Sequence, residues 1–473
     1  MAAAKETPKI DLDSYITNYE GRLLIERLAT IGSSNSHLAP EALHLAVKQA
    51  KQGINAERYT ELAKQLQSVA PNDPLAVIDT DWIAITNRRT RAETERLDAE
   101  LKQYKNNLIK ESIRMGNEDL GNHYLAMGDC SSAFKCYAKM RESCTTPKHI
   151  SEMNLKLLFV SITQQNWTAA ATYRVKMSGL GISADERTAR FDPLMNAATA
   201  LANLNSGSFR DAANLFLDVN PNYILLPPQA GIKFQKEVIS PNDIAIYGGL
   251  CALATMNSAE LRTHVLENQP FRQFLELEPH LRRAISMFCN SKFTSCLAVL
   301  DSYAADYKLD YYLQKHFNML YHCIRTKSLV QWLSAFSVVT FEEISKAFPP
   351  TKHIPASLVK SGSWTLEEEL SALVKTGLNA RIDSVSERLT SPTPDARLLM
   401  IENTLNMAST QERVLSLRLH RISMAYGDGL EVKAPKFPQF PTSSFGEPIN
   451  SDGGHFTRGS GRKKEGGMGS FMV

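Results

Sequence analysis

Apolar positions between residue 14 and about residue 325 recur at intervals of three and four, the spacing of one face of a helix. Strand-like alternation is sparse there. An alanine followed four residues later by an aromatic returns three times, as Ala133 with Tyr137, Ala169 with Tyr173, and Ala212 with Phe216. Because small alanines let paired helices approach while the aromatics fill the gap to the next pair, this recurrence predicts tetratricopeptide-like helical hairpins. The intervals are unequal, so an irregular helical domain with chance recurrence is the alternative.

A different pattern follows from Ser328 onward and predicts a winged-helix module. Thr340 and Glu343 have the spacing of a capping box, and so do Thr365 and Glu368, which places two helix starts. Three helices and a hairpin in this order make a winged helix. The predicted elements are helices over Leu329–Phe336, Thr340–Phe348 and Thr365–Gly377, then strands over Ala380–Asp383 and Arg388–Thr390.

The third helix of this module carries Glu367, Glu368 and Glu369 against a single Lys375. A winged helix that reads DNA places this helix in the major groove, where phosphates require lysine or arginine. The acidic face therefore favours protein contact over DNA binding. The alternative is that the glutamates form only a solvated first turn favoured by the helix dipole, which is compatible with either partner.

A long helix follows, with apolar residues spaced alternately by three and four from Leu398 to Tyr426, interrupted by Glu412. This is the spacing of a helix that packs along another helix. Beginning near Asp395, it would extend about 45–50 Å, beyond its own module. We expect it to join a bundle with helices of other chains; packing against the repeats of its own chain is the alternative. The predicted partner-contact residues on it are Leu398, Ile401, Leu405, Leu415, Leu419 and Ile422.

Composition indicates the general class of protein but identifies no partner. The chain has 473 residues, a net charge of +3 and seven cysteines without a Cys-x-x-Cys pair, as expected of reduced core thiols in a soluble intracellular protein. No signal peptide is recognisable, and the apolar run Ile244–Met256 is too short to span a bilayer. The predicted divisions are an N-terminal helical segment (1–110), helical repeats (111–325), the winged module (326–392), the long helix (393–427) and a disordered tail (428–473).

No residue pattern indicates catalysis. The chain lacks a His-x-His pair, a His-Glu-x-x-His motif, a Gly-x-Ser-x-Gly elbow and a Walker loop. His316 and His322 do not have the spacing of two metal ligands on one helix turn. We therefore predict no catalytic residue, no cofactor and no metal.

Several segments resemble one family. The run Ser240–Thr255 resembles a segment shared by signalosome subunit one and its proteasome-lid relative. Asp11–Tyr15, Tyr19–Gly21 and Leu24–Leu28 resemble signalosome subunit one specifically, as does Ala380–Ser384 in the hairpin. Helical repeats, a winged helix and a terminal helix are together the layout of the PCI domain. The predicted fold is thus predominantly all-α, with a tetratricopeptide-like array, a PCI winged-helix module with a small β-hairpin, and a long C-terminal helix.

The resemblance implies a non-catalytic scaffold subunit of the COP-nine signalosome, which removes Nedd8 from cullins and so regulates cullin-RING ubiquitin ligases through a zinc site in another subunit. It implies contacts with other signalosome subunits through the winged module, at Ile382, and through the terminal helix. We also expect a cytoplasmic and nuclear location and no membrane partner, and the acidic third helix argues against a nucleic-acid partner. Two alternatives remain: a proteasome-lid PCI scaffold subunit, and a winged-helix regulator that binds nucleic acid.

Overall fold

The computed structural model of the chain describes residues 8–34, 37–181, 183–350, 353, 365–391 and 396–428. The predicted disordered tail lies outside the described residues. The chain divides into two compact units, Met1–Thr393 and Pro394–Val473. Helices dominate the described residues, whose strands form one three-stranded sheet, and this confirms the predicted, predominantly all-α fold.

The first unit begins with a small group of helices, which we call the N-terminal bundle. Helix α2 packs on α3, and α3 packs on α4. Leu28, Leu43 and Tyr59 are buried between them and belong to the apolar core that continues into the array. Its elements are α1 (Leu12–Thr17), α2 (Gly21–Ser33), α3 (Ala39–Ala50) and α4 (Ala56–Val69), followed by the short η1 (Pro74–Ala76).

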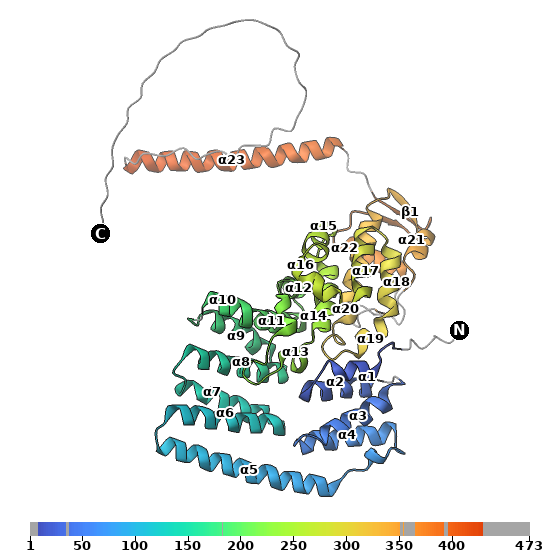
Figure 1. Cartoon of the computed structure of the whole chain (residues 1–473). Coiled ribbons are helices and arrows are strands. Elements are labelled where there is room, and N and C mark those ends of the chain that lie inside the picture. Colours follow the sequence, from blue (N-terminus) through green and yellow to red (C-terminus); the bar gives the residue numbers. More distant parts are fainter. Residues whose placement is uncertain are drawn as a thin grey trace. The chain divides into compact units, whose positions relative to one another are not determined.

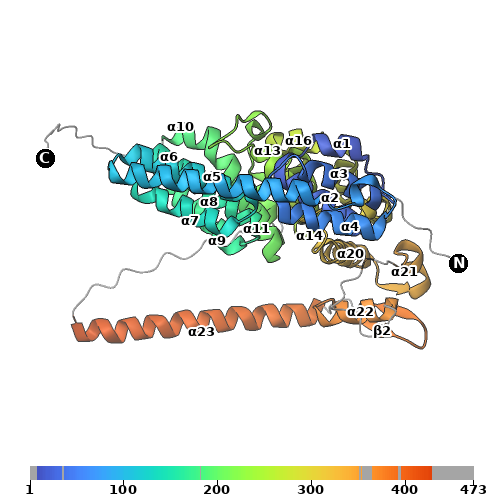
Figure 2. The same cartoon turned by 90° about the horizontal axis from the view of Figure 1, so that it is seen from below.

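A long helix, α5, then runs along the side of the array from α4 to α6 and leads into stacked helix pairs (Figure 2). Helices α6 and α7, α8 and α9, and α11 and α12 pack as neighbours. The aromatics of the recurring motif, Tyr137, Tyr173 and Phe216, are all buried, as the repeat prediction requires. The elements are α5 (Thr80–Asn106), α6 (Lys110–Met127), α7 (Cys130–Lys139), η2 (Met140–Glu142), α8 (Pro147–Thr163), α9 (Trp167–Ser178), α10 (Ala184–Glu186), η3 (Arg187–Phe191), α11 (Asp192–Ser206) and α12 (Phe209–Leu217).

Helix α14 is the central helix of this unit, because it packs against α12, α16, α17 and α20 and is buried along most of its length. It begins at a capping box in which the Ser240 side chain accepts from the Asp243 backbone while the Asp243 carboxylate accepts from the Ser240 backbone. The elements of this region are η4 (Pro221–Leu225), α13 (Phe234–Glu237), α14 (Pro241–Thr255), α15 (Ser258–Leu261), η5 (Arg262–Leu266), α16 (Gln269–Leu275), α17 (Pro279–Cys289), α18 (Phe293–Ser302), α19 (Ala304–Leu309) and α20 (Phe317–Leu333).

The winged module ends the first unit. Both predicted capping boxes are present, at Thr340 with Glu343 and at Thr365 with Glu368. The predicted hairpin is present, and an unpredicted strand, β1, adds to it to give the antiparallel order β1-β3-β2. The elements are β1 (Val338–Thr340), α21 (Phe341–Ala347), α22 (Leu366–Lys375), β2 (Arg381–Asp383) and β3 (Arg388–Thr390).

One helix boundary in this module was predicted wrongly. The helix expected to begin at Leu329 is the last part of α20, which begins at Phe317 and ends at Leu333. Its first turns carry Phe317, Leu320 and Tyr321, which are buried in the continuous core, so the helix belongs to the array as much as to the module. The second unit contributes one described element, α23 (Ala396–Asp428), close to the predicted span.

The chain returns on itself within the first unit. The N-terminal bundle lies beside α13 and α19, far along the sequence, and not only beside α5, which follows it (Figure 1). Helix α2 packs on α13, and the backbone N–H of Glu20 donates to the carbonyl of Lys236 at 3.0 Å. The bundle therefore closes a ring between the first repeats and the helices that precede the winged module.

Two glycines at helix ends differ in the space around them, and the comparison shows how closely the bundle contacts the first repeat. Gly128 and Gly207 both end helices in the left-handed region, at φ 100° and 85°. A Cβ on Gly128 would lie 2.3 Å from Asn55 Nδ2, whereas a Cβ on Gly207 would meet nothing within 4 Å. Asn55 cannot turn away freely, because its Oδ1 caps α4 by accepting from the Arg58 backbone at 3.0 Å.

We expect Gly207→Ala to lower the free energy of unfolding by about 1–2 kcal/mol, the cost of the backbone conformation alone. Gly128→Ala should cost roughly 1–3 kcal/mol more, because it also overpacks the contact with Asn55. Denaturant unfolding of the two variants beside the parent protein measures both values. Equal losses would show that the bundle and the first repeat are not in tight contact at this point.

Candidate interaction surfaces

The described residues contain no cluster of three or more histidine, cysteine or acidic side chains that could hold a metal. Burial raises the pKa of the Cys296 thiol to about 12 and lowers the pKa of His280 to about 4, so at neutral pH the first is a thiol and the second an uncharged ring. Over the same ranges, the helices are too short or too polar to cross a bilayer.

Helix α23 presents the surface that the sequence predicted. Leu405 and Leu419 expose about two thirds of their side chains, at 64% and 67%, although they are among the most apolar residues of the helix. The other predicted contact residues are exposed as well. They are Leu398, Ile401, Leu415 and Ile422. Their role in partner contact stays a prediction, and the structure adds that these side chains are not buried within their own unit.

The helix also carries a second apolar stripe that the sequence reasoning missed. It lies roughly on the opposite face, since its residues follow the same spacing but start two positions later. Its members, all exposed, are Met400, Met407, Val414, Leu417 and Met424. A helix with apolar stripes on two faces can be enclosed by helices on two sides, as in the interior of a bundle.

The sheet of the winged module has two outer strands, β1 and β2. Ile382 lies on β2, but its side chain is half-buried and packs against the module's core. Its predicted partner contact would therefore use the edge of the strand, and it stays a prediction. Val338 on β1 and Val385 in the turn are exposed apolar side chains at the same sheet, and the sequence pattern did not single them out.

The three glutamates of the acidic third helix, α22, have different surroundings. Glu369 is buried and forms an ion pair with Arg325 of α20, with Oε1 2.8 Å from Nε. Glu368 serves the capping box of Thr365, and Glu367 accepts from Ser384 Oγ at 2.5 Å. The alternative, in which the three glutamates form only a solvated first turn, fails at Glu369, because spacing alone does not reveal a buried arginine on another helix.

The most buried polar network of the first unit centres on Arg27 of α2. Its guanidinium Nη2 lies 2.7 Å from Asp243 Oδ2 at the start of α14, and its Nη1 lies 2.6 Å from Asp310 Oδ2, just after α19. The hydroxyl of Tyr19 donates to Asp243 Oδ1 at 2.7 Å, and that of Tyr247 donates to Asp310 Oδ1 at 2.7 Å. Three separate regions of the chain therefore meet at one fully buried cation.

Burial and neighbouring charges oppose one another in this network. Burial acts to lower the pKa of Arg27, but Asp243 and Asp310 outweigh it and hold that pKa well above its usual value. The arginine is therefore charged at every pH at which the protein folds. Its ring contact with Tyr19, at 4.2 Å from guanidinium carbon to ring centroid, adds a cation–π interaction. An arginine without these partners could not be buried at acceptable cost.

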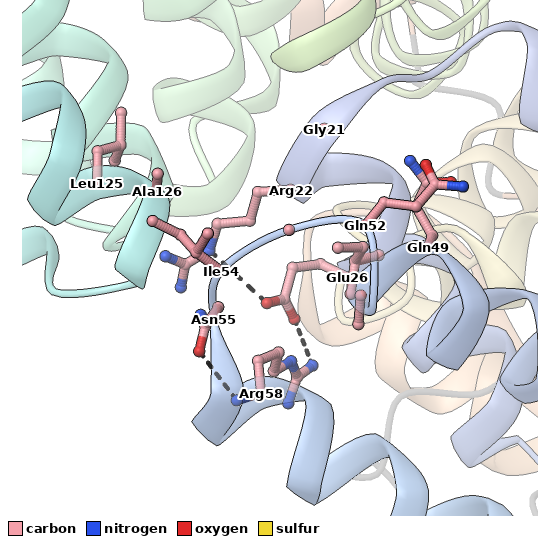
Figure 3. A pocket seen from close by; sticks show the side chains of 13 residues that line it. Gly21, Arg22, Glu26, Gln49, Gln52, Ile54, Asn55, Arg58, Leu125 and Ala126 are labelled. Atoms are coloured by element: carbon pink, nitrogen blue, oxygen red, sulfur yellow. Dashed lines mark hydrogen bonds and ion pairs between the residues drawn. The ribbon is translucent and has the colours of Figure 1, made fainter. Parts of the chain in front are cut away.

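Next to this network lies a series of cavities between the N-terminal bundle and the helical array (Figure 3). Their volumes are about 510, 430 and 230 Å³, and Arg22 of α2 lines all three. Arg22 Nη1 donates to Cys130 Sγ of α7 at 3.2 Å. Glu26 pairs with Arg58 at 2.6 Å and so faces the largest cavity from within the bundle (Figure 3).

Known families match the two parts of this unit. The family described as 26S proteasome subunit RPN7 matches residues 79–264, which cover the helical array. The PCI domain family matches residues 300–392, which cover the winged module and the helices before it. The chain is therefore a PCI-domain protein with an N-terminal helical-repeat region, as the resemblance implied.

Individual relatives narrow this class further. COP9 signalosome complex subunit 1 of Emericella nidulans is 45% identical over 436 residues, which cover 92% of this chain and 85% of that protein. The protein of the same name from Arabidopsis thaliana is 34% identical over 88% of this chain and 90% of its own length. A 26S proteasome non-ATPase regulatory subunit 6 from rice, Oryza sativa, is 25% identical over 42% of this chain and 46% of its own length. This chain belongs to the COP9 signalosome subunit 1 family.

The burial of Glu369 allows a matched test within one helix. Glu369→Gln leaves Arg325 buried without a carboxylate, which should destabilise the winged module by about 3–5 kcal/mol. Glu367→Gln changes the same chemistry at an exposed position and should change stability by no more than about 0.5 kcal/mol. Thermal unfolding followed by circular dichroism compares the two. Similar losses for both would contradict the buried pair.

Proposed function

We propose that this chain is a scaffold subunit of the COP9 signalosome and that it joins other subunits through its winged module and α23. The observation that carries the proposal is α23 itself, a helix of 33 residues with exposed apolar stripes on two faces. Such a helix is stable only when other helices cover its stripes. A PCI module with two outer strands offers a second contact, because a neighbour's strand can extend its sheet.

Through the assembled complex, the chain would act on cullin-RING ubiquitin ligases, since the family resemblance implies a complex that removes Nedd8 from cullins. The chemistry would belong to another subunit. The family resemblance supports this division. We further propose a cytoplasmic and nuclear location.

The proteasome-lid alternative has less support. The rice proteasome relative covers 42% of this chain, whereas the Emericella signalosome subunit covers 92% at higher identity. The proteasome RPN7 family matches residues 79–264, which include α14, and this explains why the sequence alone kept both complexes open. Co-purification with other signalosome subunits, or with proteasome ATPases, separates the two assignments.

Replacing both Leu405 and Leu415 with aspartate tests the role of α23. The two charges would have to be buried in a helix bundle, which is strongly unfavourable, so we expect the variant to be lost from the assembled complex. The first unit should stay folded, because the two leucines are exposed on α23. Size-exclusion chromatography of the tagged chain with its partners measures incorporation, and immunoblotting for Nedd8-modified cullin should show accumulation in the same cells.

A matched control adds the same charges away from the stripes. Ser409→Asp with Ser423→Asp places two aspartates on the polar face of the same helix, and this variant should assemble like the parent. Normal co-elution of the Leu405 and Leu415 variant would refute the assembly role of this helix. If neither variant were incorporated into the complex, α23 would tolerate no added charge at all. That result would contradict the claim that the apolar stripes are the specific contact.

A further inference from the structure

The helices of the N-terminal bundle pack mainly on one another, and a short connection joins them to α5. They pack consecutively and enclose Leu28, Leu43, Tyr59 and Leu66, all at most 1% exposed. Residues 70–79 form the connection, and α4 makes few contacts with α5. The bundle therefore depends on contacts with distant parts of the chain to hold its position in the ring.

On the side of the first repeats, these contacts are few and interrupted. Asn55 meets Gly128 at the end of α6, and Arg22 meets Cys130 at the start of α7. Between and beside them lie the cavities that Arg22 lines, with volumes of about 510 and 430 Å³ for the two larger ones. An interface that contains such cavities lacks the dense packing of a protein interior.

On the opposite side, α2 packs on α13, the Glu20 backbone bonds to Lys236, and ionic groups add to this attachment. Arg27 is fully buried against Asp243 and Asp310, whose side chains are 4% and 15% exposed. Glu20 adds two pairs, with Lys233 and Lys236, both at 2.7 Å, but these are partly exposed and contribute little. Of these ionic attachments, the Arg27 network is the fully buried one.

We propose that the Arg27 network is a latch that holds the N-terminal bundle closed on the helical array, and that its release opens the Arg22 cavities while both parts stay folded. Buried ion pairs add little net stability compared with apolar packing, but they tolerate no intermediate geometry, because each separated charge would be buried without a partner. A latch of this kind gives two states, closed and open. The helices of the bundle stay packed on one another in either state.

The structure contains a reporter for the open state. Cys130 is 8% exposed, and its Sγ accepts a hydrogen bond from Arg22, which lines the cavities, so opening would expose its thiol. Cys251 and Cys296, at 0% exposure in α14 and α18, lie in the core of the array and become accessible only when the array unfolds. The three thiols distinguish opening of the bundle from general unfolding in one experiment.

The test is the rate of iodoacetamide labelling of each cysteine in the full chain, read by peptide mass spectrometry. Arg27→Met should raise the rate at Cys130 about tenfold or more, since loss of even 1.4 kcal/mol from the closed state gives that factor. The rates at Cys251 and Cys296 should stay unchanged. Arg96→Met, which removes an exposed pair with Glu93 on α5, is the matched control and should leave all three rates as in the parent.

Because Arg27→Met leaves two buried carboxylates, it could also unfold the array. The milder variant Asp310→Asn keeps the Arg27 pair with Asp243, so it distinguishes opening of the bundle from unfolding of the array. A selective rise at Cys130 in Asp310→Asn supports the latch. An unchanged Cys130 in both variants, or a parallel rise of all three thiols in Asp310→Asn, overturns it.

Discussion

The ion pairs of Arg27 with Asp243 and Asp310 are the interaction on which the arrangement of the first unit depends. Asp243 is fixed twice, by the capping box that starts α14 and by the hydroxyl of Tyr19. Since α14 packs on four other helices of the array, a cation held at its first turn positions the N-terminal bundle against the whole core. The cost of burying these charges is offset only when all the partners are in place.

This network explains why two separate segments carry the family resemblance. Asp11–Leu28 supplies Tyr15, Tyr19 and Arg27, and Ser240–Thr255 supplies Asp243 and Tyr247. In the fold, each segment completes the other's hydrogen bonds. A substitution in one would leave a buried charge or hydroxyl in the other without a partner. Segments that carry the resemblance thus also hold the ring together, and the surfaces offered for assembly, the winged module and α23, lie elsewhere in the chain.

Sequence patterns predicted those parts of the fold that depend on interactions between residues close together in the chain. The helical array, both capping boxes of the winged module and the stripe from Leu398 followed from spacing, because each depends on neighbours within a few residues. Strand β1 was not predicted, because three residues are too few to show the alternation of a strand. The second stripe of α23 was not predicted, because the search stopped at the first stripe. The pairs of Arg27 with Asp243 and of Arg325 with Glu369 join residues 216 and 44 positions apart. No spacing rule connects such residues, so only the folded structure reveals them.

The central claim is that Arg27 and Asp243 act as one unit in holding the bundle to α14. A double-mutant cycle with Arg27→Met and Asp243→Asn, measured as free energies of unfolding in denaturant, tests it directly. The account predicts that the double variant loses less stability than the sum of the two single variants, by about 2 kcal/mol or more, because either change alone leaves an uncompensated buried charge. Losses that add within about 0.5 kcal/mol would show that the two residues act independently, and would contradict the account.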